Sequence, residues 1–244
     1  MQITDYLVLF GSVMIGGITF FLIRKPDQRI LKLILSFSGA FLFALSVLHL
    51  MPDVYLNSGA SIGAWIMLGF FIQIILEFFS EGIEHGHVHI HAHHEGVFPL
   101  TMMVSLCLHS FLEGMPLAGR LAATSTAEHH HDHSLLFGII LHHLPVAFAL
   151  VSMLMASGIG KNKTILLLVV FAIMGPLGAG ISQMLSDGIL INITSWYDKI
   201  MAVVIGIFLH ISTTILFESS SDHRFNLYKM AAIATGGIIG FIAS

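Results

Sequence analysis

Two short polar motifs lie inside apolar segments of this 244-residue chain, and they contain the residues best suited to metal chemistry. The first is HSFLEG at residues 109–114, and the second is HHLP at residues 142–145. His109 and Glu113 are four residues apart, so they share one face of a helix. Imidazole and carboxylate groups in this arrangement are ligand types that suit borderline divalent ions such as Zn²⁺.

The composition indicates where these motifs lie. The chain is 56% hydrophobic and 10% charged, with a mean hydropathy of +0.90. A soluble domain carries about 25% charged residues, so we expect an all-α integral membrane protein. An ionisable side chain at membrane depth costs roughly 2.5–3.5 kcal/mol and therefore indicates a functional site. The single cysteine, Cys107, excludes an internal disulfide framework.

Hydropathy predicts eight transmembrane helices joined by short connections, because each apolar segment approaches the ~20 residues that a bilayer requires. We expect one polytopic domain over residues 1–244, with no separate soluble domain. The predicted spans are 5–23, 30–51, 61–80, 98–119, 134–157, 163–185, 196–217 and 226–243.

The basic residues predict the orientation of these spans. Eight of the ten lie in or beside the first, third, fifth and seventh loops, and only Arg120 and Lys199 lie on the opposite side. Positive residues favour the cytoplasmic side, so both termini are expected to face outward from a plasma (inner) membrane. The eight are Arg24, Lys25, Arg29, Lys32, Lys161, Lys163, Arg224 and Lys229.

The two motifs are expected to meet near the middle of the bilayer. His109 is about eleven residues into the fourth span from the inner side, or roughly 16 Å. His142 is about eight residues into the fifth span from the outer side, which places it roughly 18 Å from the inner edge of a ~30 Å core. We predict a metal site of His109, Glu113 and His142, with Ser110 or His143 as a fourth donor. The alternative is a polar network that only holds the helices together.

A second set of polar residues is expected to form a metal pathway. His49 and Asp53 are four residues apart at the outer end of the second span. His210 lies in the seventh span, and Glu218, eight residues later, lies near its cytoplasmic end. We interpret them as entrance and exit positions. Solvated helix ends explain Asp53 and Glu218 equally well.

Two histidine-rich segments lie between the predicted spans, at residues 84–96 on the cytoplasmic side and 128–133 on the outer side. Such segments bind metal without a fixed geometry, which favours metal capture or sensing over an inert polar linker. The capture residues of the cytoplasmic loop are His85, His87, His89, His91, His93 and His94.

Glycine and proline recur within the spans. Small residues allow membrane helices to approach closely, so most of the glycines are expected to be packing positions. Pro116 and Pro145 each follow a predicted ligand by three residues, and a kink there would open carbonyl groups toward a polar cavity. The glycines are Gly11, Gly16, Gly17, Gly69, Gly175, Gly178, Gly180, Gly236 and Gly237.

The motifs resemble those of the ZIP (Zrt/Irt-like protein) family of divalent-metal transporters. Besides HSFLEG, the resemblance rests on HHLPVAFAL at 142–150, GPLGAG at 175–180, HLMPD at 49–53 and the histidine-rich loop. It implies uptake of Zn²⁺, or of Fe²⁺, Mn²⁺ or Cd²⁺, into the cytoplasm by an elevator-type carrier. It also implies a primary site of His109, Glu113 and His142, with Ser110 and His143 beside it. We expect no enzyme activity, no cofactor and no nucleic-acid partner, and small-residue faces allow a homodimer.

The sequence departs from the family pattern at two positions. Val146 stands where many members carry a second ligand, and Gly175 stands where some bacterial members carry a glutamate. We therefore predict a single metal site. An intramembrane metalloprotease would need a motif such as His-Glu-x-x-His, which does not occur. A cation-efflux antiporter usually has six spans, and a metal-sensing or structural membrane protein is the third alternative.

Overall fold

The computed structural model describes residues 2–23, 28–80, 98–123, 132–186, 196–217 and 227–243, and all regular structure in these ranges is helical. The elements are α1 (Ile3–Leu22), α2 (Gln28–Leu45), η1 (Ser46–Leu50), α3 (Met51–Ser58), η2 (Ala60–Ile62), α4 (Gly63–Ser80), α5 (Phe98–Ala123), α6 (Asp132–Ala156), α7 (Lys161–Ser186), α8 (Tyr197–Phe217) and α9 (Leu227–Ala243).

The helices have the length and composition of membrane spans. Seven described helical segments are long and apolar enough to cross a bilayer, while α9 is a shorter apolar helix of 17 residues. Large apolar side chains such as Phe71, Phe78 and Phe241 are more than half exposed, as expected of a surface that faces lipid. The prediction of an all-α membrane protein is confirmed, and the crossing by α9 stays a prediction.

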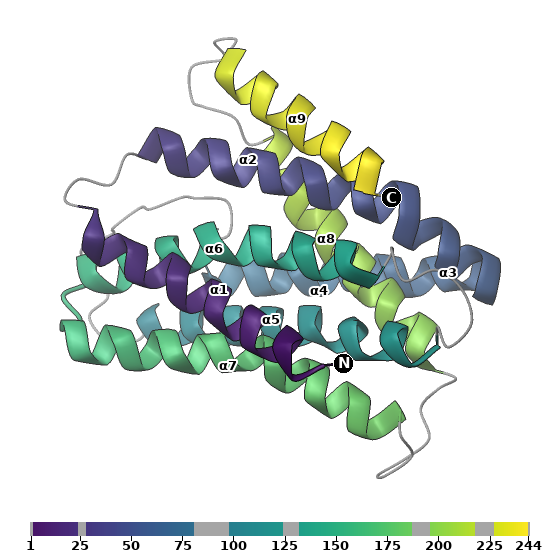
Figure 1. Cartoon of the computed structure of the whole chain (residues 1–244), viewed down its shortest axis with the longest axis horizontal. Coiled ribbons are helices and arrows are strands. Elements are labelled where there is room, and N and C mark those ends of the chain that lie inside the picture. Colours follow the sequence, from purple (N-terminus) through teal and green to yellow (C-terminus); the bar gives the residue numbers. More distant parts are fainter. Residues whose placement is uncertain are drawn as a thin grey trace.

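The helices form two bundles, which we call the first and the second bundle. In the first, α5 packs along α7, and α1 packs along α6 and α7 (Figure 1). In the second, α2 packs along α9, and α4 packs along α8. Contacts between the bundles, chiefly α2 with α6 and α4 with α5, are less extensive than these.

Glycines let the paired helices touch through their backbones. A Cβ at Gly178 of α7 would collide with the carbonyl oxygen of Phe111 on α5, and one at Gly69 of α4 would collide with that of Val203 on α8. The packing prediction is confirmed at these positions. Gly11 and Gly237 are exceptions, because a Cβ there would meet no described atom within 4 Å.

The second predicted span ends later than expected. It was predicted to stop at residue 51, but the helical segment continues through the π-helical turn η1 and through α3 to Ser58. Pro52 occupies the first turn of α3, directly after η1. A proline ring would clash with the carbonyl four residues earlier in a regular helix, and the wider π turn relieves this clash. Gly59, with φ 70°, then ends α3.

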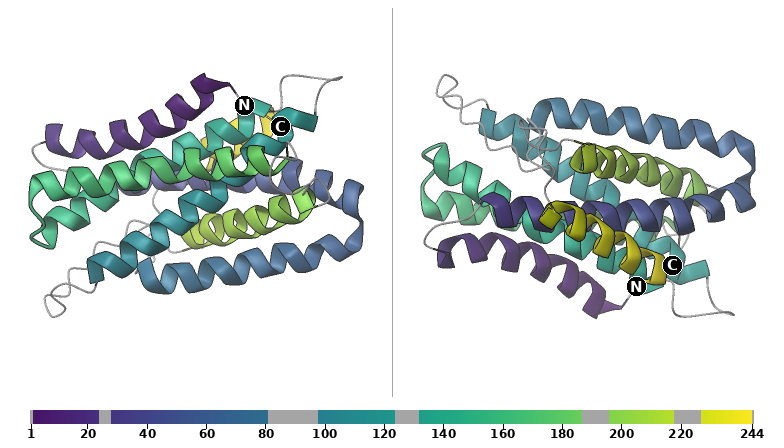
Figure 2. Two further views of the ribbon diagram at one scale, coloured as in Figure 1. Left: turned by 90° about the horizontal axis from the view of Figure 1, so that it is seen from below. Right: turned by 90° about the horizontal axis from the view of Figure 1, so that it is seen from above.

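The first and last described helices, α1 and α9, begin and end on the same side of the helical bundle. The start of α1 and the end of α9 lie toward the same end of the molecule (Figure 2). Near that end, Ser134 at the start of α6 donates a hydrogen bond to the carbonyl of Ala243, at 2.8 Å. The number of membrane crossings and the side on which both ends lie stay predictions.

Candidate metal centre

Adjacent helices of the first bundle bring the predicted ligands together. Helix α5 carries His109, Ser110 and Glu113, and α6 carries His142 and His143, all at most 1% exposed. His109, Glu113 and His142 each offer one potential ligand atom, and these three atoms lie within 4.8 Å of one another. The expected convergence of the two motifs is therefore present, and the binding of metal there stays a prediction.

The geometry of the three groups is close to that of a metal site. His109 Nε2 lies 3.1 Å from Glu113 Oε1, and the rings of His109 and His142 have centroids 6.0 Å apart. Ligands at 2.0–2.2 Å from a tetrahedral Zn²⁺ are separated by about 3.4 Å. The three atoms would need to draw closer by at most about 1.4 Å. Two nitrogens and one oxygen leave the fourth position of a tetrahedral ion open.

His143 and Ser110 lie beside this cluster. His143 Nε2 is 2.8 Å from Glu113 Oε2, so the carboxylate of Glu113 lies between two imidazoles. The Ser110 hydroxyl is buried without a hydrogen-bond partner among the described residues. A Cβ built at Gly175 would be 3.4 Å from Ser110 Oγ, so this hydroxyl faces α7.

Two polar residues of α4, which the motifs did not indicate, also lie near predicted site residues. Gln73, which is fully buried, has its Oε1 3.1 Å from Nδ1 of His109. Glu77, one turn further along, has its Oε2 3.3 Å from Nδ1 of His210 on α8. The sequence does indicate them, because Gln73 and Glu77 are polar residues four apart inside the apolar segment 61–80, and a polar pair at membrane depth points to a functional position.

Of the predicted pathway residues, His210 lies in α8 of the second bundle, and His49 and Asp53 lie in the helical segment that continues α2. The described partner of His210 is Glu77, with the ring of Phe70 at 4.8 Å, and Glu218 lies outside the described residues. His49 lies in η1 and Asp53 in α3, and both are half-buried.

The histidine-rich segments lie almost entirely outside the part of the chain that the structure describes. This holds for all of residues 84–96 and for 128–131 of the outer segment. The backbone of the last two outer residues, 132 and 133, begins α6. The capture role of both segments stays a prediction.

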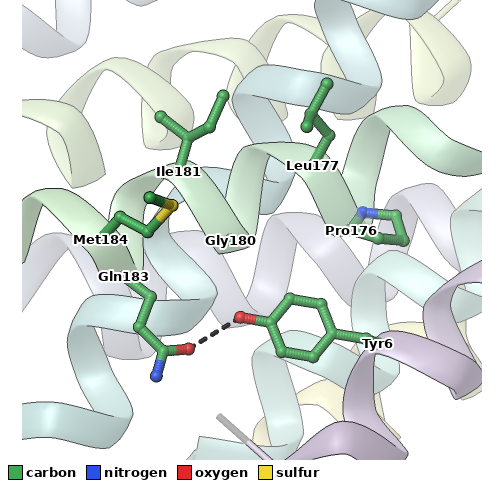
Figure 3. Close-up of a pocket in the computed structure, with 7 residues that line it drawn as sticks. All are labelled: Tyr6, Pro176, Leu177, Gly180, Ile181, Gln183 and Met184. Atoms are coloured by element: carbon green, nitrogen blue, oxygen red, sulfur yellow. Dashed lines mark hydrogen bonds between the residues drawn. The ribbon is translucent and has the colours of Figure 1, made fainter.

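A pocket of about 390 Å³ opens between α1 and α7 (Figure 3). None of the residues of the metal cluster lines it. Tyr6 and Gln183 face each other across it, with the Tyr6 hydroxyl donating a 2.7 Å hydrogen bond to Gln183 Oε1. None of its seven lining residues is a histidine, cysteine or carboxylate. The cluster of potential ligands is thus buried separately from this pocket.

Comparison with known proteins identifies the family of this chain. A family model described as ZIP zinc transporter matches residues 84–243, which is more than half of the chain. The chain belongs to the ZIP family of zinc transporters. Family members are transporters, so the ZIP match does not indicate an enzyme.

Individual ZIP relatives match parts of the chain. Zinc transporter ZIP9-B of Xenopus laevis is 31% identical over 121 residues, covering 50% of this chain and 39% of that protein. Zinc transporter ZIP9 of Micropogonias undulatus is 30% identical over 164 residues, covering 63% of this chain and 50% of that protein. The matches therefore cover half or less of these relatives.

Proposed function

We propose that this ZIP protein transports Zn²⁺, or a similar ion such as Fe²⁺, Mn²⁺ or Cd²⁺, into the cytoplasm. The observation that carries the proposal is the convergence of His109, Glu113 and His142 within 4.8 Å at a fully buried position. Burying ionisable groups on membrane-length helices costs free energy, so their presence indicates a function. Their nitrogen and oxygen donors suit Zn²⁺, and an incomplete coordination shell suits an ion that must leave again.

The two bundles suggest how the ion moves. The ligands come only from α5 and α6, so the first bundle carries the whole cluster. Less extensive packing between the bundles than within them favours sliding of the first bundle against the second. In this elevator mechanism the ion is exposed first to the outer side and then to the cytoplasm. The proposal includes eight crossings of the plasma (inner) membrane, with both termini outside.

The polar residues outside the cluster would serve as stations for the ion. His49 and Asp53 lie on the segment that leads to the outer end of the second span. The Glu77–His210 pair, at 3.3 Å, offers a carboxylate and an imidazole on the second bundle. Glu218 and the loop histidines 85–94 would receive the ion on the cytoplasmic side.

Uptake of ⁶⁵Zn²⁺ into vesicles containing the purified protein tests the proposal. His109→Ala and Glu113→Ala should reduce uptake to the level of protein-free vesicles. Tyr6→Phe removes a part-buried hydrogen bond between α1 and α7, outside the cluster, and should leave uptake intact. Wild-type uptake in both ligand variants would disprove the site, and export driven by a proton gradient would favour an antiporter.

A further inference from the structure

The second bundle places a polar side chain against one of the predicted ligands. Gln73 of α4 is fully buried, and its Oε1 lies 3.1 Å from Nδ1 of His109. One turn away along α5, the hydroxyl of Ser105 donates a hydrogen bond to the carbonyl of Leu76. These two contacts fix the register of α4 against α5 and hold the carboxamide opposite the imidazole.

The two nitrogens of His109 face different partners. Nε2 is 3.1 Å from Glu113 Oε1 and therefore lies on the side of the ligand cluster. Nδ1 faces Gln73 Oε1, and an amide oxygen can only accept a hydrogen bond. When Nε2 binds a metal ion, the remaining proton resides on Nδ1 and can be donated to this oxygen. Such a partner fixes the tautomer and orientation of a ligating histidine and strengthens its bond to the metal.

We infer that Gln73 is a positioning residue for the metal site, supplied by the bundle that does not carry the ligands. This inference rests on the proposed transport site. Because Gln73 belongs to α4, its hydrogen bond exists only while α5 holds its present register against α4. A displacement of the first bundle breaks that bond, weakens the grip of His109 on the ion and favours release. Gln73 thus couples the affinity of the site to the conformational state.

Three variants of the purified full-length chain separate this role from packing. Gln73→Met keeps the length of the side chain and removes the acceptor, so the Kd for Zn²⁺ should rise 10- to 100-fold. Gln73→Glu keeps an acceptor at the same reach, so its Kd should equal or fall below that of the wild type. Gln183→Met makes the same exchange on α7, outside the cluster, and should bind Zn²⁺ as the wild type does. The Kd is measured by competition with a chromogenic zinc chelator.

A wild-type Kd in Gln73→Met would overturn the inference, and so would a Gln73→Glu variant as weak as Gln73→Met. His109→Ala distinguishes this failure from that of the proposed function. If His109→Ala binds Zn²⁺ like the wild type, the transport site itself is wrong. If His109→Ala alone loses affinity, only the role of Gln73 is wrong.

A measurement on the wild type tests the tautomer of His109 directly. In the zinc-loaded protein with ¹⁵N-labelled histidine, His109 should bind the ion through Nε2 and carry its proton on Nδ1. Long-range ¹H–¹⁵N spectra distinguish the two tautomers, with His109→Ala used to assign the signal. A proton on Nε2 and ligation through Nδ1 would contradict the inference.

Discussion

His143 Nε2 lies 2.8 Å from Glu113 Oε2, while the other oxygen of the same carboxylate faces His109. Both oxygens of Glu113 therefore have an imidazole partner. The contact with His143 prevents the carboxylate from rotating and keeps Oε1 directed toward the ligand cluster. His143, the least defined of the predicted ligands, thus has a distinct position from His142, whose ligand atom belongs to the cluster itself.

Replacing the two neighbouring histidines should have unequal effects. His142→Ala removes a ligand and should abolish Zn²⁺ binding at the buried site, leaving only the binding by the unchanged histidine-rich segments. His143→Ala removes only the partner of Glu113, and such outer partners contribute about 10- to 100-fold in affinity. Competition with a zinc chelator measures both, with Tyr6→Phe as the control. If His143→Ala is as severe as His142→Ala, His143 is a ligand.

The contact between α5 and α7 should be sensitive to one methyl group. A Cβ at Gly178 would collide with the backbone carbonyl of Phe111, which cannot move without shifting α5 between His109 and Glu113. Gly178→Ala should destabilise the protein by about 1–3 kcal/mol and weaken Zn²⁺ binding. Melting of the detergent-solubilised protein measures the stability.

Gly180→Ala is the matched control on the same helix. Its added Cβ would meet Tyr6 Cε1 at 3.9 Å, which is an ordinary contact. This variant should melt within a few degrees of the wild type. Equal melting temperatures for Gly178→Ala and Gly180→Ala would show that the close approach of α5 and α7 does not limit stability.

Sequence alone could predict the helices and the convergence of the two ligand motifs. Hydropathy fixes the length of each span, and counting residues inward from each membrane face gives similar depths for His109 and His142. The sequence alone could not predict which spans pack against each other, because side-chain packing between helices decides this. Gln73 and His109 are therefore recognised as partners only when α4 is placed against α5.

The contact between His210 and Glu77 is a second example of a pairing between helices that the sequence does not reveal. The Nδ1 of His210 lies 3.3 Å from Oε2 of Glu77 on α4, a contact between helices that their separation in the sequence does not indicate, while Glu218 lies outside the described residues. The extension of the second span has a local cause instead. Pro52 indicates a helix end by the usual rules, and the π-helical turn before it allows the helix to continue.

Zinc affinity should fall as the solution becomes acidic. His109 and His142 bind a metal ion only through deprotonated nitrogens, and an ordinary imidazole has a pKa of about 6.5. Affinity should be complete well above this value and should decline below it, by up to about 100-fold per pH unit when two protons compete. Kd measurements between pH 5.5 and 7.5 check this. A wild-type profile that stays flat over this range would contradict the ligand set.

A second metal position should be created by one substitution in α7. Val146 is fully buried in an apolar cluster, and Gly175 has no side chain, so the native site should hold one ion. A Cβ at Gly175 would lie 3.4 Å from Ser110 Oγ, which leaves a longer side chain within reach of this hydroxyl on the helix that also carries Glu113. Gly175→Glu should raise the metal content by about one Cd²⁺ per chain, because a carboxylate is an added anionic ligand.

Elemental analysis of the purified, Cd²⁺-loaded proteins measures this difference. The histidine-rich segments are identical in the wild type and in Gly175→Glu, so their bound metal cancels in the comparison. Gly175→Gln has the same size without the charge and should stay near the wild-type content. An equal gain for Gly175→Gln would attribute the effect to changed packing of α7 against α5, because the amide cannot supply the negative charge that a second divalent ion needs beside the first.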